Sequence, residues 1–176
     1  MKQVSIFSLA LLVCTITANA QPSHAQQVSN TKEPIYKMAF NNLSIGNPAY
    51  SQLVLQAWKD FDNNTLDNSA HIFADDVLIT LPDGTAIKGK DKAMAGIKEY
   101  RSQFKSLSSQ VHAVTTLKAS DVPDREVVSI WGLETAVDKN GATTKTQLNE
   151  VWFINKAGKV IEMHQMAAKD STPEKK

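Results

Sequence analysis

Cysteine is almost absent from this sequence: Cys14 is the only one among 176 residues. It lies in an N-terminal segment that we expect to be removed, so the mature chain would contain no thiol. Disulfide bonds, cysteine nucleophiles and thiolate metal sites would then be excluded. The remaining length of about 150 residues suits one domain. Its stability must come from an apolar core rather than from cross-links.

The segment 1–20 has the features of an export signal. Lys2 gives it a positive start, Val4–Ile16 is a short apolar run, and Ala18–Ala20 has the small-x-small pattern of a cleavage site. The run is too short to span a bilayer, which argues against the alternative of an uncleaved anchor. A lipoprotein acylated at Cys14 is a second alternative. We expect cleavage at the end of this segment and an exported protein, periplasmic or secreted.

An excess of charge of one sign is also lacking. The sequence has 19 Lys and Arg against 18 Asp and Glu, and Lys2 is the only charged residue before the expected cleavage site. A neutral chain lacks the basic footprint of nucleic-acid-binding proteins and has little attraction for a membrane. Gly-rich phosphate loops, G-x-S-x-G and H-E-x-x-H motifs and histidine clusters are missing as well. We therefore expect no cofactor and no metal.

The rest of the chain is predicted to form a single domain over residues 45–170. A partly disordered lead-in at 21–44, rich in Gln, Ser, Asn and Thr, precedes it. A short disordered tail at 171–176 is expected to follow it.

Helices are predicted first along this domain and strands mainly after them. The first helix begins at the N-cap Asn47 and ends at 62–64, a short one covers about 65–73, and a third follows Gly89 and reaches Phe104. Turn signals separate the predicted strands, which are Val77–Leu81, 111–119, 126–137, 143–154 and 159–167. This order indicates an α+β fold with helices on one face of a curved antiparallel sheet.

Glu150 is the main candidate for chemistry. Alternation along a strand places it on one face with Leu148 and Trp152. Inside a pocket without a cation, desolvation would raise its pKa and suit it to proton transfer. A half-exposed Glu150 paired with a lysine is the alternative, and the strand pattern leaves both open. Trp58, Trp131 and Trp152 are similarly either the walls of one cavity or ordinary core residues.

The order of five short segments along the chain resembles that of a known family. These segments are Trp58–Asp62, Phe73–Val77, Leu81–Gly84, Gly89–Asp91 and Gly158–Ile161. Over about residues 45–168 the chain resembles the nuclear transport factor 2-like superfamily, and most of all its SnoaL-like polyketide cyclase and ketosteroid isomerase branch. The resemblance implies a cone-shaped curved antiparallel sheet around a long N-terminal helix and two further helices, enclosing a pocket. Enzymes and binding modules share this fold, so it does not decide the function.

The resemblance also implies which family residues are kept. The general-base aspartate of the ketosteroid isomerases corresponds to Leu81, which takes no proton. Their oxyanion-hole aspartate corresponds to Glu150, and their tyrosine falls near Ala57. The Asp-Arg-Asp trio of related epoxide hydrolases is not found, because Arg101 and Arg125 are expected on a helix and in a loop. A pocket without most of the isomerase machinery is therefore expected.

The same resemblance points Trp131, Leu133, Trp152, Met163 and Gln165 into the cone and His164 away from it. With Glu150 as the catalytic candidate, the complete expected pocket consists of Trp58, Leu81, Ile97, Trp131, Leu133, Leu148, Trp152, Met163 and Gln165.

Three functions fit these residues. We favour an exported module that binds a small, largely apolar ligand. A cofactor-independent cyclase, isomerase or lyase that uses Glu150 is the alternative. A third is a homodimeric assembly module whose interface is the outer sheet face, where Val151 and Phe153 would otherwise form an apolar patch.

Overall fold

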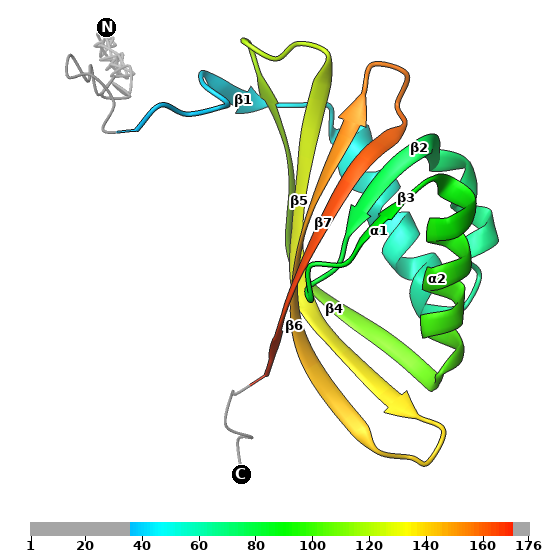
Figure 1. Cartoon of the computed structure of the whole chain (residues 1–176). Coiled ribbons are helices and arrows are strands. Elements are labelled where there is room, and N and C mark those ends of the chain that lie inside the picture. The colour runs from blue at the N-terminus through cyan, green and yellow to red at the C-terminus, as the bar shows by residue number, and fades with distance from the viewer. Residues whose placement is uncertain (1–35, 171–176) are drawn as a thin grey trace, which may run out of the picture. The chain divides into compact units, whose positions relative to one another are not determined.

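A seven-stranded sheet is the framework of the unit that begins at Met38. A computed structural model describes residues 36–170, and the predictions for 1–35 and 171–176 lie outside the described residues. The strands follow one another across the sheet in the order β1-β4-β5-β6-β7-β2-β3. Their bounds are β1 Leu43–Ile45, β2 Phe73–Thr80, β3 Ala86–Lys88, β4 Phe104–Ala119, β5 Arg125–Asp138, β6 Thr143–Asn155 and β7 Val160–Lys169. Figure 1 shows the sheet strongly curved, with both long helices on its concave side.

The first helix, α1 (Pro48–Asp62), begins where local signals predict. Asn47 is the N-cap: its Oδ1 accepts a hydrogen bond from the main-chain N–H of Ala49 at 3.0 Å. Pro48 follows at the first helical position. Proline has no main-chain N–H, but the N–H at this position would have no hydrogen-bond partner within the helix, so nothing is lost. Val54, Ala57 and Trp58 form the buried face of the helix. The cap therefore sets the start of the element that supplies one wall of the later site.

Replacing Asn47 by alanine should reduce the free energy of unfolding by about 1 kcal/mol, because the cap hydrogen bond to Ala49 is lost. Equilibrium urea unfolding of both proteins measures the difference. The control is Gln52→Ala, an exposed position in the same helix, for which a change below about 0.5 kcal/mol is expected. Equal effects of the two variants would contradict the capping role.

The second predicted helix is wrong in type. In place of one helix over 65–73, the chain forms two 3-10 turns, η1 (Leu66–Asn68) and η2 (Ala70–Ile72), and Phe73 already begins β2. Asp60 explains the tight turns, because its buried carboxylate accepts hydrogen bonds from Thr65 and Ser69. These bonds draw the chain back on α1 before a longer helix forms.

The third helix, α2 (Lys90–Ser102), is shorter than predicted. Phe104 is the first residue of β4 rather than the end of the helix. Two short strands escaped prediction: β3, and β1, which includes Leu43 and Ser44 of the predicted lead-in. The sheet is antiparallel as predicted except between β2 and β7, which run parallel.

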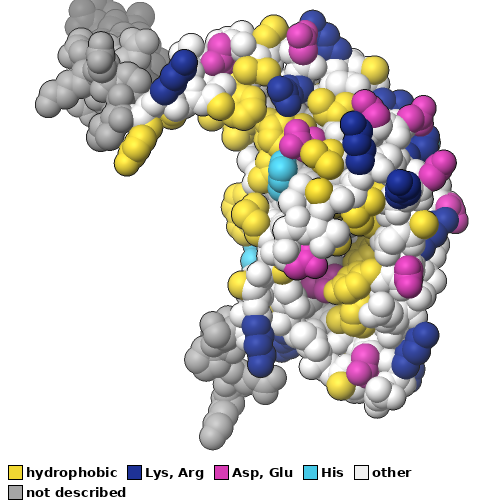
Figure 2. Space-filling view, viewed as in Figure 1, with side chains coloured by type: hydrophobic (Ala, Val, Ile, Leu, Met, Phe, Trp, Pro, Cys, Tyr) yellow, Lys and Arg dark blue, Asp and Glu magenta, His cyan; other side chains and the backbone are white. Residues whose placement is uncertain are grey.

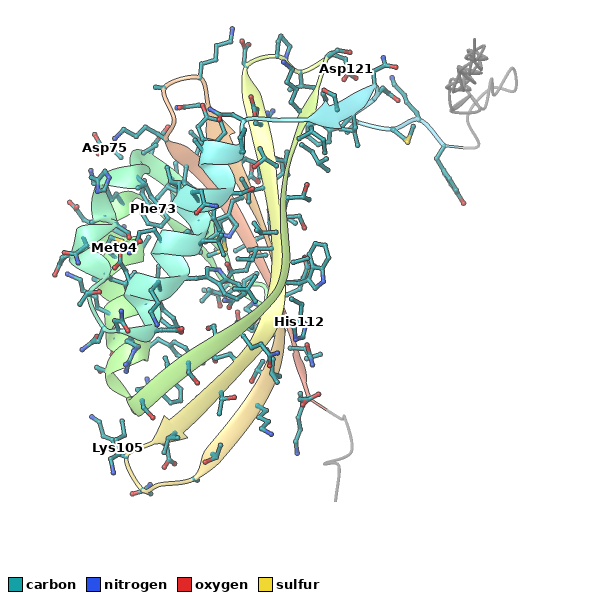
Figure 3. All side chains as sticks on the ribbon, turned by 180° about the vertical axis from the view of Figure 1, so that it is seen from behind. Phe73, Asp75, Met94, Lys105, His112 and Asp121 are labelled. Atoms are coloured by element: carbon teal, nitrogen blue, oxygen red, sulfur yellow. The ribbon has the colours of Figure 1, made fainter. Side chains whose placement is uncertain are left out.

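The core lies between the helices and the concave face of the sheet. Its fully buried members come mainly from β2, β5 and β6, and include Val77, Ile79, Val128, Ile130 and Ile154. Figure 3 shows Phe73 and Met94 on this helical side of the sheet, and both are buried. None of the helices within residues 36–170 is both long and apolar enough to cross a membrane.

The β5–β6 hairpin determines which side chains face the core. The N–H of Asp138 donates to the carbonyl of Ala142, so the loop has the three residues Lys139–Gly141, with Gly141 at φ +89°. This loop places Ile130 opposite Glu150 and Trp131 opposite Asn149. Residues directly opposite each other lie on one face of a sheet. A loop one residue shorter would have reversed the faces of β5 relative to β6.

Candidate functional site

A cavity of about 540 Å³ lies between the concave face of the sheet and the helices α1 and α2. This size is typical of small-molecule sites. Its walls are largely apolar, and five aromatic side chains contribute to them: Trp58, Phe61, Phe73, Tyr100 and Trp152. Figure 2 shows hydrophobic and acidic side chains together in the hollow below the centre of the view.

Most residues predicted for the pocket line this cavity. They are Glu150 together with Trp58, Leu81, Ile97, Leu148, Trp152, Met163 and Gln165. The last two reach the same wall because β7 pairs with β6 so that Met163 is opposite Trp152 and Gln165 is opposite Glu150. His164, predicted to point away, alternates with them and contacts Phe153 on the other face.

The predicted orientation of Trp131 and Leu133 is wrong. Both lie on the outer face of β5, and Trp131 has 39% of its surface exposed. The cause is the three-residue loop of the β5–β6 hairpin, which gives the inner face to the even-numbered residues of β5. Glu134, which the sequence interpretation did not single out, therefore lines the cavity instead.

Glu150 is buried, with 5% of its surface exposed, and no lysine within residues 36–170 forms an ion pair with it. Its Oε2 accepts hydrogen bonds from Nε1 of Trp58 at 2.6 Å and from Nε1 of Trp152 at 2.9 Å. Its Oε1 accepts one from Nε2 of Gln165 at 2.7 Å. Desolvation raises the pKa of the carboxyl, and these three N–H donors offset only part of that rise. Of the two environments that the sequence left open, the structure has the buried one.

Glu134 is the second buried carboxyl group of the cavity, also with 5% of its surface exposed. Burial is the main cause that raises its pKa to about 7; the negative charges of Asp62 and Glu150 also raise this pKa, and the positive charge of Arg101 lowers it. A carboxyl group that titrates near neutral pH is suited to both giving and taking a proton. The sequence contained one signal for it: Gly141 favours a three-residue loop, and that loop turns Glu134 inward.

Arg101 and Asp62 hold the end of α1 beside Glu134. Nε and Nη2 of Arg101 each donate to a main-chain carbonyl, of Phe61 and Asp62 respectively, at 2.9 Å. The Asp62 carboxylate accepts hydrogen bonds from the main-chain N–H and the hydroxyl of Ser109, both at 2.9 Å. Arg101 thus satisfies terminal carbonyls of the helix rather than forming the acid–arginine trio of the epoxide hydrolases.

The positions that correspond to the isomerase machinery have other roles. Leu81 lines the cavity as an apolar wall. Asp83, two residues later, also lines it, but its Oδ1 accepts the main-chain N–H of Thr85 at 2.8 Å and stabilises the turn. Ala57 carries no hydroxyl. Tyr100 brings a phenol to the cavity from α2, and burial raises the pKa of that phenol.

No group of three or more His, Cys, Asp or Glu side chains suited to a metal ion occurs within residues 36–170. Of the histidines, His71 bonds through its ring to the carbonyl of Asn68, and His164 to Glu162. Figure 3 shows His112 on the sheet rather than in the helical layer.

The outer sheet face is partly covered. Phe40 packs against Phe153 with ring centroids 6.2 Å apart, whereas Val111, Trp131 and Met166 remain exposed. The homodimer interface predicted for this face stays a prediction.

No family model and no curated protein matches the sequence. Solved structures with similar folds are found at low identity. A proposed scytalone dehydratase from Novosphingobium aromaticivorans has 13% identity and a TM-score of 0.60, over 72% of this chain and 88% of its own. A proposed SnoaL-like polyketide cyclase from Shewanella denitrificans has 10% identity and a TM-score of 0.58, over 69% and 92%.

A third similar structure is a protein of unknown function from Burkholderia pseudomallei, with 18% identity and a TM-score of 0.55 over 69% of this chain and 90% of its own. Structural similarity at such low sequence identity shows a shared fold and not a shared activity. The chain has the nuclear transport factor 2-like fold, as the order of its sequence motifs predicts.

Proposed function

We propose that the protein is a cofactor-independent enzyme of the isomerase, cyclase or lyase type, which transfers protons on a small, largely apolar substrate. The observation that carries this proposal is the burial of Glu150 in the wall of the cavity, where none of the lining residues of the described chain is a cation. A carboxyl group with a raised pKa removes a proton near neutral pH more effectively than an exposed one. We also propose that the protein acts outside the cytoplasm, as its N-terminal segment predicts.

The contacts of Glu150 support its role in proton transfer. The indole N–H groups of Trp58 and Trp152 hold one carboxyl oxygen, and the amide of Gln165 is the one side-chain donor to the other within the described residues. The orientation of the carboxyl is therefore constrained by three contacts. In an isomerisation, this group would take a proton from one carbon of the substrate and return it to another. The proton taken from one carbon is the proton returned to the other, so the step balances with Glu150 as the single acid–base group.

A binding module remains the competing function, because the position of the isomerase base is Leu81. Proton exchange distinguishes the two. The protein is incubated in D₂O with a panel of small cyclic ketones and enones, and NMR follows deuterium incorporation next to the carbonyl. We expect catalysed exchange for at least one compound, and a loss of about 10²-fold or more in Glu150→Gln.

The matched control is Glu99→Gln, an exposed glutamate on α2, which should keep the rate of the unchanged protein. Glutamine fits at position 150, since its oxygen accepts both indole N–H groups and its amide donates to a reoriented Gln165 carbonyl. Saturable binding of panel compounds without any catalysed exchange would overturn the enzyme and favour the binding module.

A further inference from the structure

The charges around the cavity are unequal. Asp83, Glu134 and Glu150 line it, and the negative charge of Asp62 acts on Glu134. The guanidinium of Arg101 is the cation that acts on Glu134, and its hydrogen bonds go to main-chain carbonyls. None of the lining residues, all within the described part of the chain, is Lys, Arg or His. Four carboxyl groups thus stand against one guanidinium in and around the cavity, which disfavours an anionic ligand.

Glu134 differs from Glu150 in its hydrogen bonds. Glu150 accepts three N–H donors, whereas no side chain or main-chain group among residues 36–170 donates to Glu134. Yet only 5% of its surface is exposed, and it lines the cavity. No fully buried side-chain oxygen among the described residues lacks a hydrogen-bond partner, so the carboxyl oxygens of Glu134 open into the cavity. A positively charged N–H donor of a ligand would there meet a carboxylate that no protein group engages.

Aromatic rings surround the space next to this carboxyl. Phe61 and Tyr100 lie with ring centroids 6.4 Å apart and their planes nearly parallel, and both line the cavity with Trp58 and Trp152. The faces of such rings attract cations, most strongly where water is excluded. Aromatic faces beside an unpaired carboxyl are the chemistry that recognises an organic ammonium ion.

We propose that the substrate is a small hydrophobic amine, bound as its ammonium ion with Glu134 as the counter-ion and its apolar body against the aromatic walls. This inference rests on the proposed function, because it concerns the same cavity. Glu134 is then the group that selects the substrate, and Glu150 is the group that transfers the proton.

The inference makes binding depend on pH. Burial raises the pKa of Glu134 most, and the negative charges of Asp62 from α1 and Glu150 from β6 raise it as well. Arg101 from α2 lowers it and Tyr100 from α2 faces the same carboxyl, and the resulting pKa is about 7. An ammonium ion requires the ionised form. Binding near pH 7 therefore releases part of a proton from Glu134, and affinity rises with pH while the ligand stays charged.

Three ligands of similar size and different charge test the inference: 2-naphthylmethylammonium, 2-naphthylmethanol and 2-naphthoate. Isothermal titration calorimetry measures their binding at pH 6, 7 and 8. We expect the ammonium to bind about tenfold more tightly than the alcohol at pH 8, and the carboxylate to bind most weakly. Affinity for the ammonium should rise about tenfold from pH 6 to pH 8, whereas affinity for the alcohol should not change.

Two further experiments test whether Glu134 is the counter-ion of the ammonium: substitution of this residue, and titration in different buffers. Glu134→Gln should abolish the preference for the ammonium over the alcohol, and Glu99→Gln should keep it. Titration at pH 7 in buffers of different ionisation enthalpy should show proton release with the ammonium alone. Circular dichroism establishes that each variant is folded before binding is compared.

The outcomes separate the two proposals. Alcohol binding as tight as ammonium binding would overturn the amine inference and leave the proposed function standing, provided that proton exchange on neutral ketones is observed. Absence of binding by all three ligands would overturn the inference as well. Absence of exchange both on the ketone panel and on cyclic amino ketones, with a clear preference for the ammonium, would overturn the enzyme and leave an amine-binding module.

Discussion

Replacing Glu150 by leucine is expected to lower the free energy of unfolding by about 3 kcal/mol. Leucine fills a similar volume but accepts no hydrogen bond, so the indole N–H groups of Trp58 and Trp152 lose their acceptor. Each buried donor left without a partner costs about 1–3 kcal/mol. The amide of Gln165 loses its partner too, but this side chain is only partly buried and can turn toward water.

Urea unfolding of the two proteins at pH 6 measures this effect, and Glu150→Gln is the matched variant. Glutamine keeps the acceptor for both indoles, so a loss below about 1 kcal/mol is expected for it. Comparing Glu150→Leu with Glu150→Gln separates the effect of the lost hydrogen bonds on stability from the effect of the lost charge. If leucine were tolerated as well as glutamine, the three contacts would contribute little to stability, and the constrained orientation of Glu150 would lose its support.

Local signals in the sequence were sufficient for the features that depend on neighbouring residues. Asn47 and Pro48 start α1 where predicted, since a cap acts within a few residues. The flanking Leu148 and Trp152 indicated a buried Glu150 as one possibility. They did not decide it, because the indole of Trp58 that completes the environment comes from a residue 92 positions earlier.

Features that depend on distant pairing were predicted poorly. One loop residue in the β5–β6 hairpin determines whether Trp131 or Glu134 faces the cavity, and alternation along β5 alone fits both. The parallel pairing of β2 with β7 joins segments far apart in the sequence. The 3-10 turns after α1 form because the Asp60 carboxylate draws Thr65 and Ser69 toward it, which overrides a helical pattern. In each case tertiary contacts outweigh local preference.

The stability of the protein is expected to fall by about 2.5 kcal/mol between pH 5 and pH 8, mainly because of Glu134. Its pKa in the folded protein is about 7, above the ordinary value of 4.5. The folded state thus binds this proton more tightly than the unfolded chain does. The stabilisation is fully present below about pH 4.5 and is lost as the pH rises through 7. A difference of one pKa unit corresponds to about 1.4 kcal/mol, which gives the expected size.

Unfolding free energies at pH 5 and pH 8 measure this slope in the unchanged protein and in Glu134→Gln. The variant should lose most of the slope and be the more stable of the two at pH 8, whereas Glu99→Gln should keep the slope. An unchanged slope in Glu134→Gln would contradict the assignment. The pKa of Glu150 is raised as well, so its contribution has the same sign. The double variant Glu134→Gln/Glu150→Gln then measures the pH dependence that comes from all other groups. Ionisation of either carboxyl group in the cavity destabilises the folded protein, so removing both should remove both contributions.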